Sequence, residues 1–150
     1  MTPSDTTSSS PSPLQLNPIG EVHSPHQQVV GMPIQPSRAR GVEGTVEVYE
    51  EYAEGLADLD GFSHIILLYH FHRSQGHSLR VVPFLDTVER GLFATRAPRR
   101  PNPLGLSVLR LLGIDGATLR VADIDILDGT PVLDIKPYVP DFDARTGDNV

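Results

Sequence analysis

The segment LGLSVLRLLGIDGATLRVADIDILDGTPVLDIKPYV, residues 104–139, contains three apolar runs separated by two Asp-Gly dipeptides. The runs cover residues 104–114, 117–127 and 131–139, and the dipeptides are Asp115-Gly116 and Asp128-Gly129. Apolar runs of this length between turn signals are typical of β-strands. Asp-Gly between such runs is a strong short-range signal for a tight hairpin turn. The segment therefore predicts three strands joined by short turns.

Further strand candidates lie toward the N-terminus. Residues 14–24 predict a strand that bends at Pro18, and residues 42–52 alternate valines with acids, which predicts a strand with one wet face. Residues 63–72 form a near-continuous apolar run, which predicts a strand buried on both sides. Residues 79–85 predict a short strand broken by Pro83, and residues 84–92 allow one or two helical turns. Many short strands favour a mainly β fold, either a closed barrel or a sandwich.

The composition fits a single small domain. The chain has 150 residues, enough for one domain with a real core. We expect a disordered tail at residues 1–13, a folded domain at residues 14–143 and a flexible tail at residues 144–150. The absence of Cys excludes disulfides and thiolate-bound metals. No apolar run approaches the roughly 20 residues of a membrane span, and the N-terminus does not read as a signal peptide, so we expect a cytoplasmic protein.

Charge is distributed unevenly along the chain. The net charge is −7, with acidic segments at residues 43–60 and 115–134 and a basic segment at residues 90–110. The acidic balance argues against indiscriminate nucleic-acid binding. A local cationic patch on an acidic body fits one anionic ligand or one shaped RNA better.

The basic segment centres on ATRAPRRPNPLGLS, residues 94–107. Each proline fixes its own φ and pushes the preceding residue toward extended backbone, which makes this connection stiff. Arg96, Arg99 and Arg100 on such a loop suit a carboxylate or a phosphate. The alternative, which general frequencies favour, is an ordinary proline-rich connection whose arginines pair with surface acids.

Two further groups of residues invite a functional interpretation. In LDGTPVLDIKPY, residues 127–138, the turn offers backbone hydrogen bonds to a nucleoside or an amino-acid moiety. The simpler alternative is a β-turn followed by a structural ion pair between Asp134 and Lys136, which share one strand face. His64, His70 and His72 suggest a metal site, but a half-buried histidine with satisfied hydrogen bonds is commoner than a ligand. We therefore expect no metal.

Several motifs in this order make the chain resemble a known family. They are FSH at residues 62–64, FH at 71–72, FATR at 93–96, RPNPLGLS at 100–107 and LDGTPVLDIKPY at 127–138. Together they resemble the TsaA-like family, also called TrmO-type tRNA methyltransferases, over residues 14–143. The resemblance implies a small closed or nearly closed antiparallel β-barrel with one or two short helices, which works as a homodimer and binds S-adenosylmethionine. It also implies N6-methylation of N6-threonylcarbamoyladenosine at tRNA position 37.

The resemblance also implies which residues form the site. The implied cofactor contacts are Pro33, Gln35, Pro36, His72, Arg73, Arg96, Asp128, Gly129, Thr130 and Pro131. The expected substrate contacts are Arg99, Arg100, Asn102, Lys136 and Tyr138. Our hypothesis is that Arg96 serves the cofactor while Arg99 and Arg100 face the RNA. No base for the N6 proton is evident; Asp128 and His64 are the candidates, and the carbamoyl group lessens the need for a strong one.

Two departures from the family pattern leave alternatives open. Ile34 stands where many relatives have Arg, and the additional C-terminal domain of longer bacterial members has no counterpart in these 150 residues. One alternative is therefore an S-adenosylmethionine-binding barrel that methylates another RNA or a small molecule. The other is a non-catalytic module that binds a nucleoside.

Overall fold

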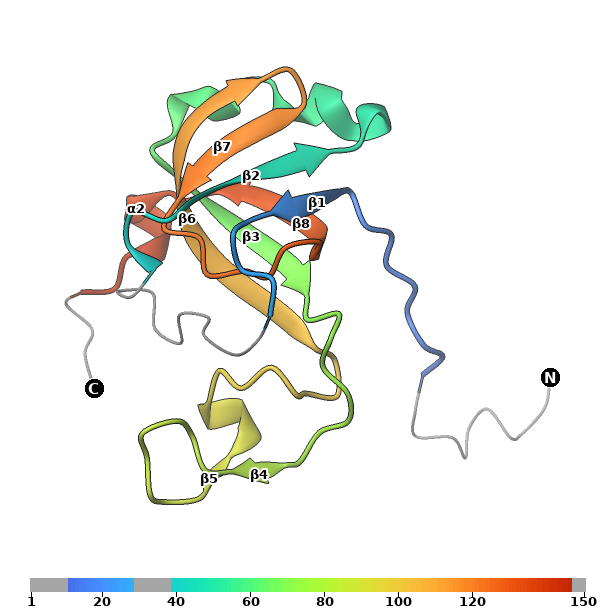
Figure 1. Ribbon diagram of the computed structural model, residues 1–150, viewed down its shortest axis with the longest axis vertical. Helices are drawn as coiled ribbons and strands as arrows, with labels where there is room; N and C mark the ends of the chain where they lie inside the picture. Colours follow the sequence, from blue (N-terminus) through green and yellow to red (C-terminus); the bar gives the residue numbers. More distant parts are fainter. Residues whose placement is uncertain (1–10, 29–38, 147–150) are drawn as a thin grey trace.

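Six strands form a closed antiparallel barrel in the computed structural model, which describes residues 11–28 and 39–146 (Figure 1). The order around the barrel is β1-β2-β7-β6-β3-β8, and the pairing of β1 with β8 closes it. The strands are β1 (Gly20–His23), β2 (Glu43–Val48), β3 (His64–His70), β6 (Leu104–Asp115), β7 (Thr118–Ala122) and β8 (Pro131–Pro137). The prediction of a mainly β, closed antiparallel barrel is confirmed.

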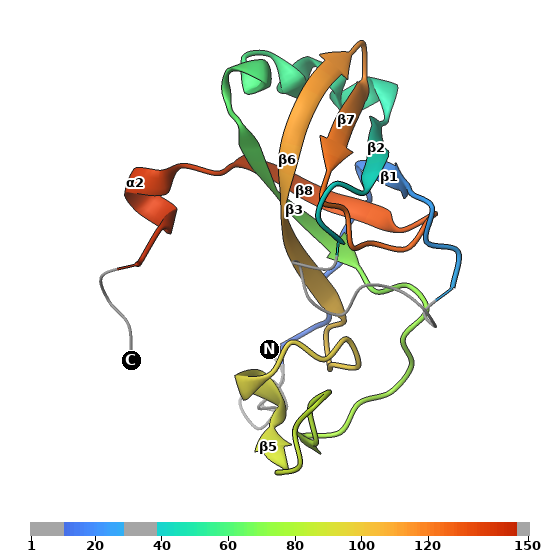
Figure 2. The ribbon, with the colours of Figure 1, turned by 60° about the vertical axis from the view of Figure 1, so that its left-hand side comes forward.

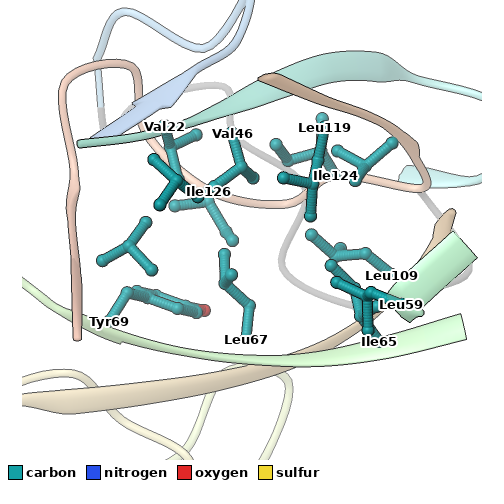
Figure 3. Close-up of a cluster of buried hydrophobic side chains, with 13 residues drawn as sticks. Val22, Val46, Leu59, Ile65, Leu67, Tyr69, Leu109, Leu119, Ile124 and Ile126 are labelled. Carbon is teal, nitrogen blue, oxygen red and sulfur yellow. The ribbon is translucent and has the colours of Figure 1, made fainter. Parts of the chain in front are cut away.

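The barrel interior is filled by aliphatic side chains from every strand. Alternate residues of β3 point inward, so that Ile65, Leu67 and Tyr69 are buried while Ile66 and Leu68 are only half-buried. Figure 3 shows this inner row meeting side chains from the opposite wall. The prediction that residues 63–72 are buried on both sides is therefore wrong, because the described residues form a single-layered barrel and only its inner face is fully covered.

Only one of the two Asp-Gly dipeptides forms a hairpin between neighbouring strands. Asp115-Gly116 joins β6 to β7, and Gly116 has the positive φ of 62° that tight turns need. β7 and β8 are not neighbours in the barrel, so the chain between them crosses the barrel end. We call residues 123–130 the crossing segment. The strand expected at 117–127 ends at Ala122, because Asp123 has a φ of 67°, which breaks the extended backbone.

The short helices of the described residues lie on connections outside the barrel wall. They are the 3-10 helices η2 (Glu50–Leu56), η3 (Leu59–Gly61) and η4 (Leu92–Ala94), and the α-helical turn α2 (Pro140–Asp143). None is long and apolar enough to cross a membrane. The helical turns expected at residues 84–92 are wrong. There the Asp86 carboxylate accepts hydrogen bonds from the amides of Thr87 and Val88 at 2.7 and 3.0 Å, which holds a turn instead.

Residues 73–103 form a long excursion between β3 and β6, which we call the arm. Figures 1 and 2 show the arm extending beyond one end of the barrel. It contains a two-stranded ladder of β4 (Arg80–Val81) and β5 (Arg90–Gly91), followed by η4. The strand expected at residues 79–85 is thus reduced to two residues, because Pro83 interrupts it. Likewise, the strand expected at 14–24 is formed only after Pro18, as β1.

Candidate functional site

The strand register brings the principal motifs to one end of the barrel. In the antiparallel pairs, Tyr69 of β3 lies opposite Val132 of β8, and His70 lies opposite Leu104 of β6. The end of β3, the start of β8 and the return of the arm into β6 therefore meet. We call this end of the barrel, with residues 69–73, 103–105 and 128–132, the arm end. The Phe-His strand end and the Asp-Gly-Thr-Pro corner both belong to it.

Three of the predicted residues lie at the opposite end. His64 begins β3 opposite Arg110, and its carbonyl accepts a hydrogen bond from the Tyr138 amide at 3.0 Å. Lys136 forms the expected ion pair with Asp134, at 3.0 Å. At about 3.3 Å per residue, β3 separates His64 from His70 by about 20 Å, and Lys136, which lies opposite Ile66, is about 13 Å from the level of His70. Within one chain, His64, Lys136 and Tyr138 are thus not brought together with the corner.

The Asp-Gly-Thr-Pro corner is fixed against the end of β1. Its backbone bonds include Gly129 N–H to the Val22 carbonyl at 2.8 Å, and the Asp128 carboxylate accepts from the Ser24 amide at 3.0 Å. Gly129 adopts a φ of 81°, and the buried Thr130 hydroxyl donates to the Leu127 carbonyl at 2.7 Å. The corner is thus a rigid platform, in which Thr130 stabilises the turn.

The end of β3 contributes a buried ring nitrogen. His72 Nδ1 is buried and has no hydrogen-bond partner among the described residues. Burial, followed by the positive charge of Arg73, lowers the pKa of His72 below its usual 6.5. Because a buried polar atom normally has a partner, an orphaned nitrogen is what a bound ligand or a water satisfies. The Arg73 guanidinium donates to the Gln27 carbonyl at 3.3 Å, next to the corner.

The arginine-proline loop is joined to the same end. The Pro103 carbonyl accepts from the Phe71 amide at 2.8 Å, and Arg99 Nε donates to the Gln75 carbonyl at 3.0 Å. None of the three loop arginines pairs with a described carboxylate, so the expectation of surface ion pairs is wrong for the part of the chain that the structure describes. Asn102 is exposed in the same loop.

Arg100 and Arg96 have different surroundings in that loop. Arg100 donates to the carbonyls of Thr95 and Ala97 at 3.0 and 2.9 Å and lies 5.9 Å from the Phe93 ring centroid. These contacts give Arg100 a structural role in the loop, and its contact with RNA stays a prediction. Arg96 is exposed and leaves its guanidinium available. Pro33, Ile34, Gln35 and Pro36 lie outside the described residues.

A buried polar network at the arm end was not predicted. The Tyr69 hydroxyl lies 2.8 Å from Ser107 Oγ, which donates to Asp125 Oδ1 at 2.8 Å. Burial and the charge of Asp125 raise the pKa of Tyr69 to about 12, against the opposing effects of the Ser107 hydrogen bond and the Arg96 charge. The signal in the sequence was a lone Ser in one apolar run and the second of two Asp residues in the next, since polar residues inside such runs need buried partners.

Two other possible sites, a metal site and a surface pocket, have less support than the arm end. Among residues 11–28 and 39–146, no group of three His, Asp or Glu side chains is placed to hold a metal ion. A shallow pocket of about 210 Å³ is formed by η2, η3 and the end of β8, including Leu56, Phe62 and Pro137. It contains none of the predicted residues, so the arm end remains the candidate functional site.

The chain is similar to a protein family and to several named proteins of other organisms. Residues 21–144 match the family described as tRNA-methyltransferase O N-terminal domain. A probable S-adenosyl-L-methionine-binding protein of Pyrococcus abyssi is 58% identical over 128 residues, 85% of this chain and 70% of that protein. The tRNA (adenine(37)-N6)-methyltransferase of Escherichia coli K12 is 35% identical over 139 residues, 86% of this chain and 59% of that protein.

The solved structures agree with the sequence comparison. The crystal structure of TrmO from Pseudomonas aeruginosa superposes with a TM-score of 0.78 at 40% identity. The match covers 92% of this chain and 61% of that one. The described barrel is thus the fold of one part of a longer relative.

Proposed function

The chain belongs to the TrmO-type family of S-adenosylmethionine-dependent methyltransferases, and on that premise we propose that it methylates N6 of N6-threonylcarbamoyladenosine at tRNA position 37. Its cofactor is S-adenosylmethionine. The observation that carries the proposal is that the Asp-Gly-Thr-Pro corner and the end of β3, which leads to the orphaned ring nitrogen of His72, lie at the same end of the barrel. We also propose that the functional domain comprises residues 14–143 and works in the cytoplasm.

Methyl transfer from S-adenosylmethionine depends more on the positioning of the two reactants than on acid–base catalysis. S-adenosylmethionine, when bound, supplies an electrophilic methyl group for in-line displacement. His72 Nδ1 and the backbone of the corner are the groups that would hold it, since both are fixed and belong to the arm end. The exposed Arg96 guanidinium can pair with a carboxylate there. Holding both reactants in one orientation is worth several kcal/mol of the barrier in favourable cases.

Arg99 is the arginine we assign to the modified nucleoside. Its Nε atom is anchored on the Gln75 carbonyl, while its side chain belongs to an exposed part of the loop. A threonylcarbamoyl group carries a carboxylate, and a planar guanidinium can bind that group in two places at once. Of the two proton-acceptor candidates, Asp128 belongs to the arm end and His64 does not. If the N6 proton is accepted by a residue of the same chain, we assign that role to Asp128.

The experiment that tests the proposal has two stages. Calorimetry first measures S-adenosylmethionine binding, where His72→Ala should weaken the affinity and His64→Ala, a histidine at the opposite end, should not. Mass spectrometry of nucleosides then follows methylation of tRNA that carries threonylcarbamoyladenosine, with tRNA lacking it as control. Methylation of the unmodified tRNA, or of neither, would move the assignment to another RNA or a small molecule. Another RNA or a small molecule is the second candidate substrate, because this chain spans only 59% of the Escherichia coli relative.

We propose that the protein is a homodimer in which the arm packs against a second copy. Leu92 is the only fully buried side chain of the arm, so the arm lacks a core of its own. It exposes six large apolar side chains: Leu79, Val82, Phe84, Leu85, Val88 and Phe93. A cluster of exposed apolar side chains on one element is typical of a protein interface.

Sedimentation velocity tests the dimer directly. The double variant Phe84→Ser with Leu85→Ser should sediment as a monomer, because it removes apolar surface from the centre of the arm. Phe142→Ser is the matched control, since Phe142 is exposed to a similar extent but lies in α2, outside the arm. A monomeric parent protein, or a double variant that remains dimeric, would contradict the assignment of the arm.

A further inference from the structure

Three side chains form a directed chain of hydrogen bonds at the arm end. Ser107 Oγ donates its only proton to Asp125 Oδ1 at 2.8 Å, so it accepts from the Tyr69 hydroxyl, also at 2.8 Å. Tyr69 and Ser107 are buried, and Asp125 is half-buried. A satisfied polar chain in such surroundings is rigid, because each broken bond would leave a buried group without a partner.

The chain of bonds adds a side-chain link between two parts of the barrel end that backbone pairing joins at the start of β8, where Val132 lies opposite Tyr69. Tyr69 comes from β3, Ser107 from β6, and Asp125 from the crossing segment. The backbone bonds of the crossing segment run to the other side of the barrel. Its amides at Ile124, Asp128 and Gly129 donate to the carbonyls of Val42, His26 and Val22.

Besides the Ser107–Asp125 hydrogen bond, one other polar side-chain interaction joins the crossing segment to β6 among the described residues. This is the ion pair between Asp123 and Arg110, which is partly exposed and measures 3.6 Å. Exposed ion pairs of this length contribute little. The short bond from Ser107 to Asp125 is therefore the main side-chain link, among the described residues, between the crossing segment and β6, and it adds to the backbone pairing of β8 with β3.

The packing around the Tyr69 ring supports a fixed position for its hydroxyl. Gly105 of β6 lies directly opposite Tyr69, and a Cβ atom at Gly105 would approach Tyr69 Cε2 within 2.3 Å. The Phe71 ring packs edge-on against the Tyr69 ring, with centroids 5.4 Å apart. Phe71 directly precedes His72 and Arg73, so the ring that begins the network also contacts the β3 end.

We propose that Tyr69, Ser107 and Asp125 are positioning residues that hold the Asp-Gly-Thr-Pro corner at a fixed distance from the end of β3. Their consequence for methyl transfer rests on the proposed function, because the corner and the β3 end are the segments that would hold the cofactor. The network itself acts on the protein alone. It can therefore be tested with and without ligand.

Hydrogen exchange measures the network without ligand. In Tyr69→Phe and in Asp125→Asn, we expect the Asp128 and Gly129 amides to exchange roughly tenfold faster than in the parent, relative to the paired amides of β2 and β7. Ile65→Val is the matched control: it trims a buried side chain on the same face of β3 and should change both groups of amides alike. An unchanged ratio in both network variants would overturn the proposal.

Calorimetry with S-adenosylmethionine then tests the consequence for the site. Tyr69→Phe and Asp125→Asn should each raise Kd about tenfold, and the double variant should add little further, since one broken link already releases the corner. Ile65→Val should keep the parent Kd. A parent protein that fails to bind S-adenosylmethionine would refute the proposed function, while the exchange ratio still decides the network. Network variants that bind as tightly as the parent would refute the positioning role.

Discussion

Replacing Gly105 with Ala should destabilise the barrel at one defined point. The added Cβ would lie 2.3 Å from Cε2 and 2.5 Å from Cζ of Tyr69, and 2.9 Å from Cζ of Phe71. Contacts that short force atoms to move, and the Tyr69 ring cannot swing away freely, because it is buried and its hydroxyl is bonded to Ser107. The variant therefore overpacks the inner face of the arm end.

The cost can be worked out from its parts. Overpacking a well-packed interior costs about 1–3 kcal/mol, and loss of the Tyr69–Ser107 hydrogen bond adds about 1 kcal/mol. Replacing glycine within a strand returns about 0.5–1 kcal/mol of chain entropy. We therefore expect the free energy of unfolding to fall by about 1–3.5 kcal/mol, a large share of a typical domain's stability.

Urea unfolding followed by circular dichroism measures this difference, since the chain has no Trp for fluorescence. Gly55→Ala is the matched control, because nothing lies within 4 Å of a Cβ built there, and it should keep the parent stability or raise it by up to about 1 kcal/mol through the same entropic gain. Placing Gly105→Ala in a Tyr69→Leu background should recover at least about 1 kcal/mol, because the clashing ring atoms are gone. Equal midpoints for Gly105→Ala and Gly55→Ala would refute the reasoning.

Three further predictions follow from single features of the structure. The pKa of Tyr69 is raised to about 12 from 10.0, so the folded state holds this proton more tightly than the unfolded state does. The free energy of unfolding should therefore be unaffected below pH 10 and should fall by about 2–3 kcal/mol as the pH rises from 10 through 12. Urea titrations at each pH measure this decline, which Tyr69→Phe should lack. Gly129→Ala should cost about 1–2 kcal/mol in thermal unfolding, because a φ of 81° strains any residue with a Cβ even where space is open, and an unchanged Tm would contradict that. Leu109→Ala should cost about 2–5 kcal/mol by chemical denaturation, since Leu109 is fully buried in the barrel, whereas Leu104→Ala, half-exposed on the same strand, should cost under about 1 kcal/mol.

The sequence was most informative where structure depends on neighbouring residues. The apolar runs predicted β2, β3, β6 and β8, and Asp115-Gly116 predicted the β6–β7 turn, because side-chain alternation and turn chemistry are local properties. It was wrong where a side chain competes with the backbone for nearby hydrogen bonds. Residues 84–92 looked helical, but the Asp86 carboxylate captures two amides and holds a turn.

The composition of the candidate site shows the same division. The Asp-Gly-Thr-Pro corner and the Phe-His strand end were recognised as motifs, and only the family resemblance implied that they contact the same cofactor; the residue pattern itself did not place them together. Tyr69, Ser107 and Asp125 were not predicted as a group, because they are far apart in the sequence. Tyr69 and Ser107 are separated by 38 residues, and Ser107 and Asp125 by 18. Only the pairing of β3 with β6 sets Gly105 opposite Tyr69 and so leaves room for its ring.

By itself the sequence determined the strands, the stiff arginine loop and the family. The tertiary structure decided which ends of those strands meet. Closing the barrel through β1 and β8 fixes one register for all six strands, and that register sets the end of β3 beside the start of β8 while leaving His64 about 20 Å away. The reason is physical: alternation repeats every two residues and carries no information about partners, whereas closure requires every strand edge to be paired.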